Sequence, residues 1–320
     1  MKFYDVFNGD ADGLCAMHQY RLAEPRESVR ITGVKRDNAL LARIEPARGD
    51  EITVFDISIE RNREALAHAL DTGARVRWFD HHGADPVPRR PGLRTHLDFA
   101  HDTCTSLIVD RFLNGRHRAW AVVGAFGDNL AEPARAAAEP LGLSEPQLHT
   151  LRLLGECLNY NAYGESLDDL HYHPAELYDT LAQYADPLDF VVAEPVCEVL
   201  RHALGDDLAR AAEVDPLMVR ASVAAYALPD AAWARRICGH YANGLVQAFP
   251  HRAHAVLLAR PGGWQVSVRA PLEAPRGADT LCDGFEGGGG RARAAGIGLL
   301  PEAGLPAFLA ALERAWPARA

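Results

Sequence analysis

Three consecutive side chains, Asp80, His81 and His82, follow an apolar run over residues 74–79. A run of this length is typical of a buried parallel strand, and the carboxyl end of such a strand delivers its side chains to a crevice. Carboxylate and imidazole groups placed there bind metal ions or transfer protons. A single Asp-His-His triplet is weak evidence, so its meaning depends on whether other strands end in the same way.

Two further apolar segments also end in acids. Residues 2–7 lead into a glycine-containing turn with Asp10 and Asp12, and residues 51–57 place Asp56 near their end. The alternative is that Asp12 and Asp56 cap the helices that follow, although Ser58 is better placed to cap the second one. An unpaired buried carboxylate is costly, which favours a shared site over capping alone.

Strands that alternate with helices would bring these side chains together. We expect strands at 2–7, 29–34, 51–57 and 74–79, with helices at 14–22 and 61–70. This alternation predicts a right-handed parallel sheet, in which the acids and histidines all lie at the carboxyl edge.

Two later segments bear on the same edge. A helix is expected from about 101 to 113, with Asp102 or Thr103 as its N-cap. The free backbone amides of its first turn either bind an anion or are satisfied by the N-cap residue alone, and the sequence leaves both alternatives open. The apolar segment 119–126 then leads to Asp128, a further acid at the end of a buried element.

Length, composition and net charge limit the classes of protein to which the chain can belong. The chain has 320 residues, of which 48% are apolar, which suits one large or two medium domains with a real core. It has no long apolar run and no signal-like N-terminus, so we expect a soluble, cytoplasmic protein without membrane contact. The six cysteines are scattered, which predicts reduced thiols. A net charge of −10 disfavours tight, non-specific binding to long nucleic acid.

The order of these motifs resembles that of the DHH phosphoesterase superfamily, which includes RecJ-type exonucleases, short-oligoribonucleotide phosphatases and cyclic-dinucleotide phosphodiesterases. The motifs that carry the resemblance are Asp10-x-Asp12, Asp56, Asp80-His81-His82 and Asp128. Residues 287–296 are similar to the glycine-rich signature of the DHH-associated C-terminal domain. The resemblance covers roughly residues 1–130 and 250–300.

The resemblance implies a site for two manganese or magnesium ions. The two ions would lie about 3.5–4 Å apart and would bind a phosphate between them. Asp56 would bridge the two ions and Asp10 would bind the first. The second ion would be held by Asp12, His81 and Asp128. Asp80 would orient His81, and His82 would contact the scissile phosphate or protonate the leaving oxygen.

Two positions depart from the family pattern. Asn8 stands where many members carry a histidine, and a neutral amide is a weaker metal ligand. Arg291 stands where the glycine signature usually has a histidine. Arginine does not shuttle protons, but it binds phosphate bidentately.

The C-terminal part supplies candidate substrate contacts. Ser267 and Arg269 match a Ser-x-Arg element that family members place near the substrate. The run Gly288, Gly289, Gly290 and Arg291 is interpreted as a phosphate-binding loop, because backbone without side chains lets amides approach closely. The alternative is a merely flexible loop. His171 and His173 are not expected to ligate metal, since Pro174 follows them at a helix end.

The sequence therefore predicts a two-domain α/β phosphoesterase. A parallel-sheet DHH domain (1–195) would be joined by a helical linker (196–234) to a smaller mixed α/β domain (235–320), with substrate between them. The expected reaction is metal-dependent hydrolysis of short oligonucleotides, dinucleotides or bisphosphates. The alternatives are a RecJ-like single-strand exonuclease and a catalytically weakened nucleotide-binding module. No protein partner is implied, and a homodimer is compatible with the sequence.

Overall fold

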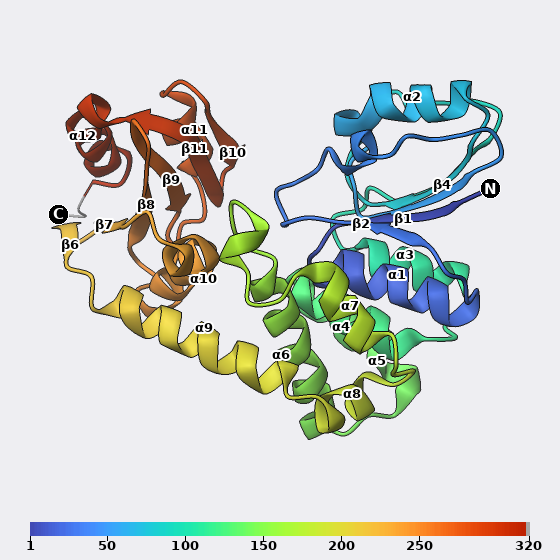
Figure 1. The fold of residues 1–320 in the computed structure, drawn as a ribbon. Coiled ribbons are helices and arrows are strands. Elements are labelled where there is room, and N and C mark those ends of the chain that lie inside the picture. The colour runs from blue at the N-terminus through green and yellow to red at the C-terminus, as the bar shows by residue number, and fades with distance from the viewer. Residues whose placement is uncertain (318–320) are drawn as a thin grey trace. The chain divides into compact units, whose positions relative to one another are not determined.

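The computed structural model describes residues 1–317 and contains two compact units, Met1–His202 and Ala203–Ala320 (Figure 1). The first is built on a parallel sheet and the second on a mixed sheet. The predicted α/β fold class is thereby confirmed. Within the described residues, every helix is too short or too polar to cross a membrane.

The first unit contains a five-stranded sheet in the order β2-β1-β3-β4-β5, with every neighbouring pair parallel. The strands are β1 (Phe3–Phe7), β2 (Val29–Ile31), β3 (Glu51–Phe55), β4 (Arg75–Asp80) and β5 (Leu93–Leu97). The chain passes from β1 to β2 on one side and then to β3 on the other. Strand order therefore reverses at β1, where parallel sheets place their ligand crevice.

Helices cover both faces of this sheet, with α2 on one face and α1 and α3 on the other (Figure 1). The α-helices of the unit are α1 (Ala11–Ala23), α2 (Arg63–Asp71), α3 (Thr105–Phe112), α4 (Arg118–Gly127), α5 (Ala131–Ala138), α6 (Glu145–Asn161), α7 (Pro174–Leu181) and α8 (Pro187–Ala193). Short 3₁₀ helices lie at Leu40–Arg43, Glu60–Asn62, Glu139–Leu141 and Leu167–Asp169.

Alternation along the central strands explains why consecutive residues near their carboxyl ends are apolar. Val54 and Trp78 belong to the core on the α2 face. Their neighbours Phe55 and Phe79 stack on each other and contact Tyr20 of α1. A strand buried on both faces carries apolar residues at every position, as central strands of parallel sheets do.

Helix α1 is buried from Ala11 to Tyr20, so it lies at the centre of the first unit. His18 of this helix donates from Nε2 to the carbonyl of Tyr184 (2.8 Å), and Trp120 packs edge-on against its ring. Its Nδ1 has no hydrogen-bond partner among residues 1–317. Burial lowers the pKa of His18 from 6.5 to about 4, because the charged ring would lose its hydration.

Stability is expected to fall on acidification because of His18. Between pH 6.5 and 4 the unfolded chain binds a proton that the folded chain excludes, so this contribution is present above pH 6.5 and lost as the pH falls through 4. The shift corresponds to about 3 kcal/mol. In urea unfolding at a series of pH values, the free energy of unfolding of wild type should fall by this amount relative to that of His18→Gln. If the difference in free energy of unfolding between wild type and His18→Gln did not change with pH, the prediction would be contradicted.

The second unit contains a six-stranded sheet in the order β10-β11-β9-β8-β7-β6, in which only β7 and β8 pair in parallel. The strands are β6 (Pro216–Val219), β7 (Val223–Leu228), β8 (Ala253–Arg260), β9 (Gly263–Arg269), β10 (Gly288–Arg291) and β11 (Ala294–Pro301). The helices are α10 (Ala232–Ala248), α11 (Ala278–Asp283), α12 (Leu305–Ala315) and a 3₁₀ turn at Glu302–Gly304. Strands β8 and β9 form a hairpin that turns at residues 261–262, and α12 is the last helix of the unit.

The two faces of this sheet pack on different helices. Ala255 and Leu257 of β8 join the core that contains Phe308 of α12. The opposite face carries Tyr226, which contacts Tyr241 of α10. Both sides of the sheet are therefore covered, although most of its strands are antiparallel.

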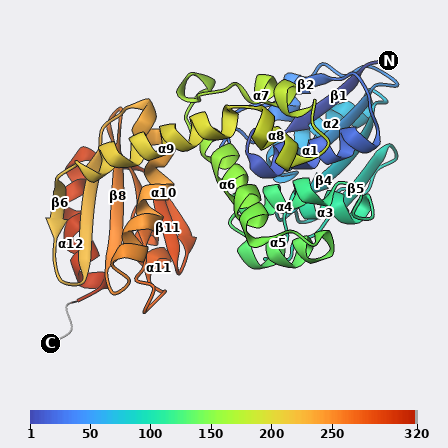
Figure 2. The ribbon, with the colours of Figure 1, turned by 90° about the horizontal axis from the view of Figure 1, so that it is seen from below.

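The predicted helical linker is shorter than expected. Helix α9 (Val196–Ala212), the yellow helix of Figure 2, contains the boundary between the units. Residues 216–219 and 223–228, which we expected within the linker, are strands of the second sheet. The segment 223–228 is rich in alanine and has a high helix propensity, but pairing with β8 along its full length outweighs that propensity.

Candidate metal centre

The turn after β1 places Asp10 and Asp12 in different roles. Asp10 caps α1, since its Oδ1 accepts the amide of Gly13 (3.0 Å). Asp12 caps α3 instead of its own helix: its two oxygens accept the amides of Thr105 and Ser106, each at 2.7 Å. The anion that the helix at 101–113 could face is therefore the carboxylate of Asp12, which the positive end of the helix stabilises.

The expected N-cap of that helix is wrong. Cys104 occupies the capping position and its side chain makes no capping bond. Asp102 and Thr103 lie two residues and one residue before the N-cap, and the first amides are satisfied instead by Asp12, which is distant in sequence. A cap supplied from another helix leaves no local sequence signal.

Asp56 follows β3 in a left-handed backbone conformation, with φ of 58°. Its amide donates to the carbonyl of Phe79 (3.0 Å), so the sheet continues to this residue. The hydroxyl of Thr105 donates to its Oδ1 (3.1 Å). A non-glycine residue in this conformation is uncommon, and here the surrounding sheet and α3 hold the carboxylate at the strand edge.

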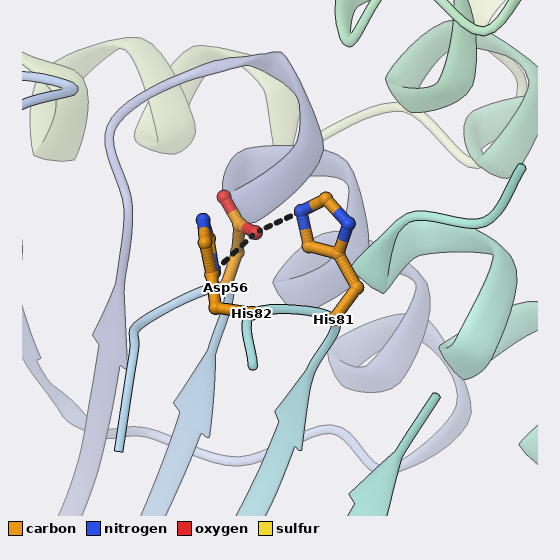
Figure 3. Close-up of side chains that lie close together, drawn as sticks. All are labelled: Asp56, His81 and His82. Carbon is orange, nitrogen blue, oxygen red and sulfur yellow. Dashed lines mark ion pairs between the residues drawn. The ribbon is translucent and has the colours of Figure 1, made fainter. Parts of the chain in front are cut away.

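His81 and His82 both approach the Asp56 carboxylate (Figure 3). His81 donates from Nδ1 to the carbonyl of Thr103 (3.1 Å), because a carbonyl can only accept. This bond leaves Nε2 directed at Asp56 Oδ1 (3.4 Å) and Asp128 Oδ2 (3.8 Å). A histidine held in this way presents a lone pair suited to a metal ion.

Asp80 orients the other histidine. Its Oδ1 accepts Nδ1–H of His82 (2.7 Å) and the backbone amide of His81 (2.8 Å). We expected Asp80 to hold the His81 ring, but Thr103 does so. The difference arises because the chain turns directly after β4, so the ring two residues on lies next to Asp80.

Asp128 completes a group of potential ligands. It ends α4, and one ligand atom each from Asp12, His81 and Asp128 lies within 4.8 Å of the others. Asp56, His81 and His82 form a second such group. Carboxylate oxygens with one imidazole suit a borderline divalent ion such as manganese. The residues of the first group are those that the family resemblance assigns to one ion.

Lys35, which follows β2, also lies at this edge and was not among the residues singled out in the sequence. Its Nζ is 2.6 Å from Asp10 Oδ2, 3.0 Å from Asn159 Oδ1 and 3.4 Å from Asp128 Oδ1. The sequence held one signal for it. Lys35 is one of only two lysines, in a chain whose other basic residues are arginine, and it follows a strand of the same sheet.

Asn8, which we considered as a weak ligand, makes two bonds within the protein. Its Oδ1 accepts the amide of Asp10 and its Nδ2 donates to the carbonyl of Lys35, both at 3.3 Å. The side chain is buried and holds the turn after β1 against the loop after β2.

Electrostatics favour a bound cation here. Burial, then the Asp10 and Asp12 carboxylates, raise the pKa of Asp56 well above its usual range. Burial and Asp12 raise the pKa of Asp128 to about 6. Burial lowers the pKa of His81, but its hydrogen bond with Asp56 and the neighbouring acids raise it to about 10. The part of each shift that comes from neighbouring carboxylates reflects the gathering of negative charge at this edge.

Asp10 differs from its neighbours. Burial raises its pKa, but the charge of Lys35 and the amide of Gly13 outweigh burial and lower the pKa below its usual value. Burial likewise lowers the pKa of Lys35, and the charges of Asp10, Tyr163 and Asp128 raise it well above its usual value. The two groups therefore form a charged pair.

Four of the candidate substrate residues of the second unit, Ser267, Arg269, Gly289 and Arg291, lie on one face of its sheet, whereas Gly288 and Gly290 alternate to the other face. Arg269, Ala294 and Arg291 are direct cross-strand neighbours on β9, β11 and β10. Ser267, Gly296 and Gly289 form the adjacent row. Directly opposite residues point to the same side of a sheet. Two arginines thus flank a strip of alanine and glycine, which we call the arginine–glycine strip.

The glycine run is a strand and not the expected loop. Gly288–Arg291 form β10, which pairs with Ala294–Ile297. A Cβ at Gly288 would lie 1.8 Å from the carbonyl oxygen of Cys282, and a Cβ at Gly290 would overlap Ala295. Close packing against α11 and β11 therefore requires glycine at these positions, which sequence alone does not distinguish from flexibility.

His171 and His173 make other contacts. The Nε2 of His171 lies 3.0 Å from the hydroxyl of Tyr160. The Nδ1 of His173 accepts the amide of Ala175 and caps α7. The two rings thus serve different elements, in keeping with the expectation that they do not form a ligand pair.

No family model and no curated protein matches the chain. Solved structures match over 98% of it. An exonuclease RecJ bound to manganese is 18% identical, with 89% of that chain covered and a TM-score of 0.52. The pGpG-specific phosphodiesterase PggH from Vibrio cholerae is 13% identical, with 99% covered and a TM-score of 0.56. An exopolyphosphatase-related protein from Bacteroides fragilis is 14% identical, with 92% covered and a TM-score of 0.53.

These identities are low, so the likeness concerns the fold. The chain shares its two-domain α/β fold with these three proteins, and the resemblance inferred from its motifs is confirmed at the level of the fold.

Proposed function

We propose that this protein is a divalent-metal-dependent phosphoesterase that hydrolyses phosphate esters of short nucleotides: short oligonucleotides, dinucleotides or nucleoside bisphosphates. The observation that carries the proposal is the convergence of Asp12, His81 and Asp128 at the switch point of the parallel sheet, beside Asp56 and His82. The fold shared with RecJ and with a pGpG phosphodiesterase supports it.

Asp12, His81 and Asp128 would hold the ion. Manganese suits this mixture of oxygen and nitrogen ligands, and magnesium is the second candidate. When bound, the ion would neutralise phosphate charge and lower the pKa of a water molecule. Thr103 fixes the tautomer of His81, and the amides of α3 hold the Asp12 carboxylate in place. The second ion expected at Asp10 and Asp56 is considered in the next subsection.

His82 is proposed as the proton donor to the leaving oxygen. Its Nδ1 is bonded to Asp80, so Nε2 is the nitrogen that would meet the substrate. The side chain is 42% exposed, which gives substrate access. Asp80 is fully buried and accepts from the ring, so it keeps the imidazole oriented and favours its protonated form.

The arginine–glycine strip is proposed to bind phosphate groups of the substrate. Arg291→Gln should weaken binding of a short nucleotide roughly ten- to a hundredfold, which is the effect of losing a hydrogen bond to a charged group. Arg293→Gln is the matched control, because Arg293 lies in the turn of the same hairpin, outside the strip. Equal losses for the two variants, measured by equilibrium binding of a dinucleotide, would show only a loss of net charge.

Hydrolysis with manganese over a panel of substrates tests the proposal. The panel is short RNA, short DNA, cyclic dinucleotides, bisphosphates and long single strands. Release of mononucleotides or phosphate from the short substrates is expected, and the net charge of −10 favours these over long strands. Equal efficiency on long strands would favour the exonuclease alternative. Binding without turnover on every substrate would favour the nucleotide-binding module.

A further inference from the structure

The ammonium group of Lys35 lies among three oxygen acceptors. They are Asp10 Oδ2, Asn159 Oδ1 and Asp128 Oδ1, at 2.6, 3.0 and 3.4 Å. An ammonium group has three N–H donors, so every donor has an acceptor within reach. Two of these acceptors are carboxylates of the candidate metal centre. The lysine is therefore part of that centre and not a solvated surface charge.

The backbone on either side fixes the position of Lys35. Its amide donates to the carbonyl of Ala162 (2.9 Å), and its carbonyl accepts from Asn8 (3.3 Å). Two residues earlier, the carbonyl oxygen of Gly33 lies so close to Gly9 that a Cβ there would be 2.2 Å away. The loop after β2 is thus clamped onto the turn after β1, and the side chain of Lys35 starts next to Asp10.

Asn8 links two departures from the expected metal site. Its position is the one at which many members of the family that the chain resembles carry a histidine. Here its oxygen accepts from Asp10 and its amide group donates to Lys35. Asn8, which stands in place of a histidine ligand, therefore positions Lys35, whose ammonium group supplies a positive charge.

A divalent ion at Asp10 does not fit beside this lysine. Manganese or magnesium requires oxygen ligands at about 2.0–2.2 Å. Nζ already lies 2.6 Å from Asp10 Oδ2, and Asp10 Oδ1 is engaged by the amide of Gly13. An ion bound to the same carboxylate would lie within a few ångströms of a fixed positive charge. Of the three proposed ligands, Asp128 contacts Lys35 through Oδ1 at 3.4 Å, and its other oxygen, Oδ2, is the one that faces His81.

We propose that the Lys35 ammonium group takes the place of one of the two divalent ions, so that the chain binds a single ion, at Asp12, His81 and Asp128. Lys35 supplies fixed positive charge to Asp10 and Asp128 at every metal concentration. Its side chain is 27% exposed, so the same charge is also accessible to a phosphate. This inference rests on the proposed function only in requiring that the centre binds metal.

Counting manganese ions tests the inference without any measurement of activity. Wild type, Lys35→Met and Lys2→Met would be titrated by equilibrium dialysis with elemental analysis, and the bound ions examined by electron paramagnetic resonance. We expect one magnetically isolated ion in wild type and in Lys2→Met, which removes the only other lysine. Lys35→Met should bind a second ion, and the spectrum should change to that of two coupled ions. The Lys35→Arg variant keeps a positive charge at this position and should bind one manganese ion.

Each other outcome is decisive. Two ions in wild type would overturn the role of Lys35 and leave the proposed function standing. A single bound ion in Lys35→Met would show that Lys35 does not exclude a second divalent ion. No ion in any variant would overturn both proposals. Should Lys35→Met fail to fold, Lys35→Gln, which keeps a donor for Asn159, would carry the same comparison.

Discussion

Replacing Asp128 by asparagine is expected to remove manganese binding and lower kcat/KM roughly a thousandfold or more, which corresponds to the loss of several kcal/mol of charge stabilisation. The same change should not destabilise the metal-free protein. Asp128 is one of three side chains whose ligand atoms converge, and it has no helix-capping bond comparable to that of Asp12. It is therefore the ligand that can be altered with least damage to the fold.

The stability of Asp128→Asn follows from the electrostatics. Burial and the Asp12 carboxylate raise the pKa of Asp128 to about 6. A raised pKa means that the ionised group is less stable in the folded chain than in the unfolded chain, so its charge costs stability above pH 6 and not below pH 4. Asparagine removes that cost. In a chelator at pH 7.5, the melting temperature of the variant should equal or exceed that of wild type.

Asp98→Asn is the matched control. Asp98 follows β5 at the same edge of the sheet, has a half-buried side chain and pairs with Arg111. It should change neither metal binding nor turnover. Retention of metal binding and turnover by Asp128→Asn would contradict the metal assignment. A large drop in its melting temperature would show that Asp128 is needed for folding, and the metal site would then be tested with His81→Ala.

The parallel sheet could be predicted because its signals are local. The strands that end near Asp10, Asp56 and Asp80 are buried on both faces toward their carboxyl ends, so each ends in consecutive apolar residues that polar residues follow. Right-handed crossovers then leave one arrangement of their carboxyl ends. The convergence of distant acids at one edge follows from topology, and it required no knowledge of side-chain contacts.

The partners of these acids could not be predicted, because they come from loops and helix ends. Asp12 receives its amides from α3, more than 90 positions away, and His81 is oriented by a backbone carbonyl that any residue type supplies. Lys35 is placed by the carbonyl of Ala162 and by the close approach of two glycines. None of these contacts leaves a pattern in residue type or spacing.

The second unit was harder to predict for a different reason. Alanine and glycine fill positions in β7, β10 and β11, and both residue types have low strand propensity. They are strands because neighbours pair with them and because α11 and α12 pack closely on the sheet. Tertiary packing there outweighs local preference, so alanine suggested helix and glycine suggested a loop.

Replacing His82 by alanine is expected to lower turnover of a nucleotide substrate by roughly 10²- to 10⁴-fold, the range for removal of a general acid. Manganese binding should persist, because His82 is not among Asp12, His81 and Asp128. The loss should depend on the leaving group. A ribose hydroxyl leaves as a poor, basic oxygen and needs a proton, whereas p-nitrophenolate leaves without one. Hydrolysis of bis-p-nitrophenyl phosphate should therefore be much less affected by the variant than hydrolysis of a dinucleotide.

His81→Ala is the comparison that separates the two histidines. Because the Nε2 of His81 faces Asp56 and Asp128 while its Nδ1 is held by Thr103, its loss should reduce metal binding and slow both substrates alike. Equal losses on both substrates for His82→Ala would remove it from proton transfer and assign it to phosphate binding. Asp80→Asn should reproduce the leaving-group pattern more weakly, since the His82 ring would keep its position but lose the charge that favours its protonated form.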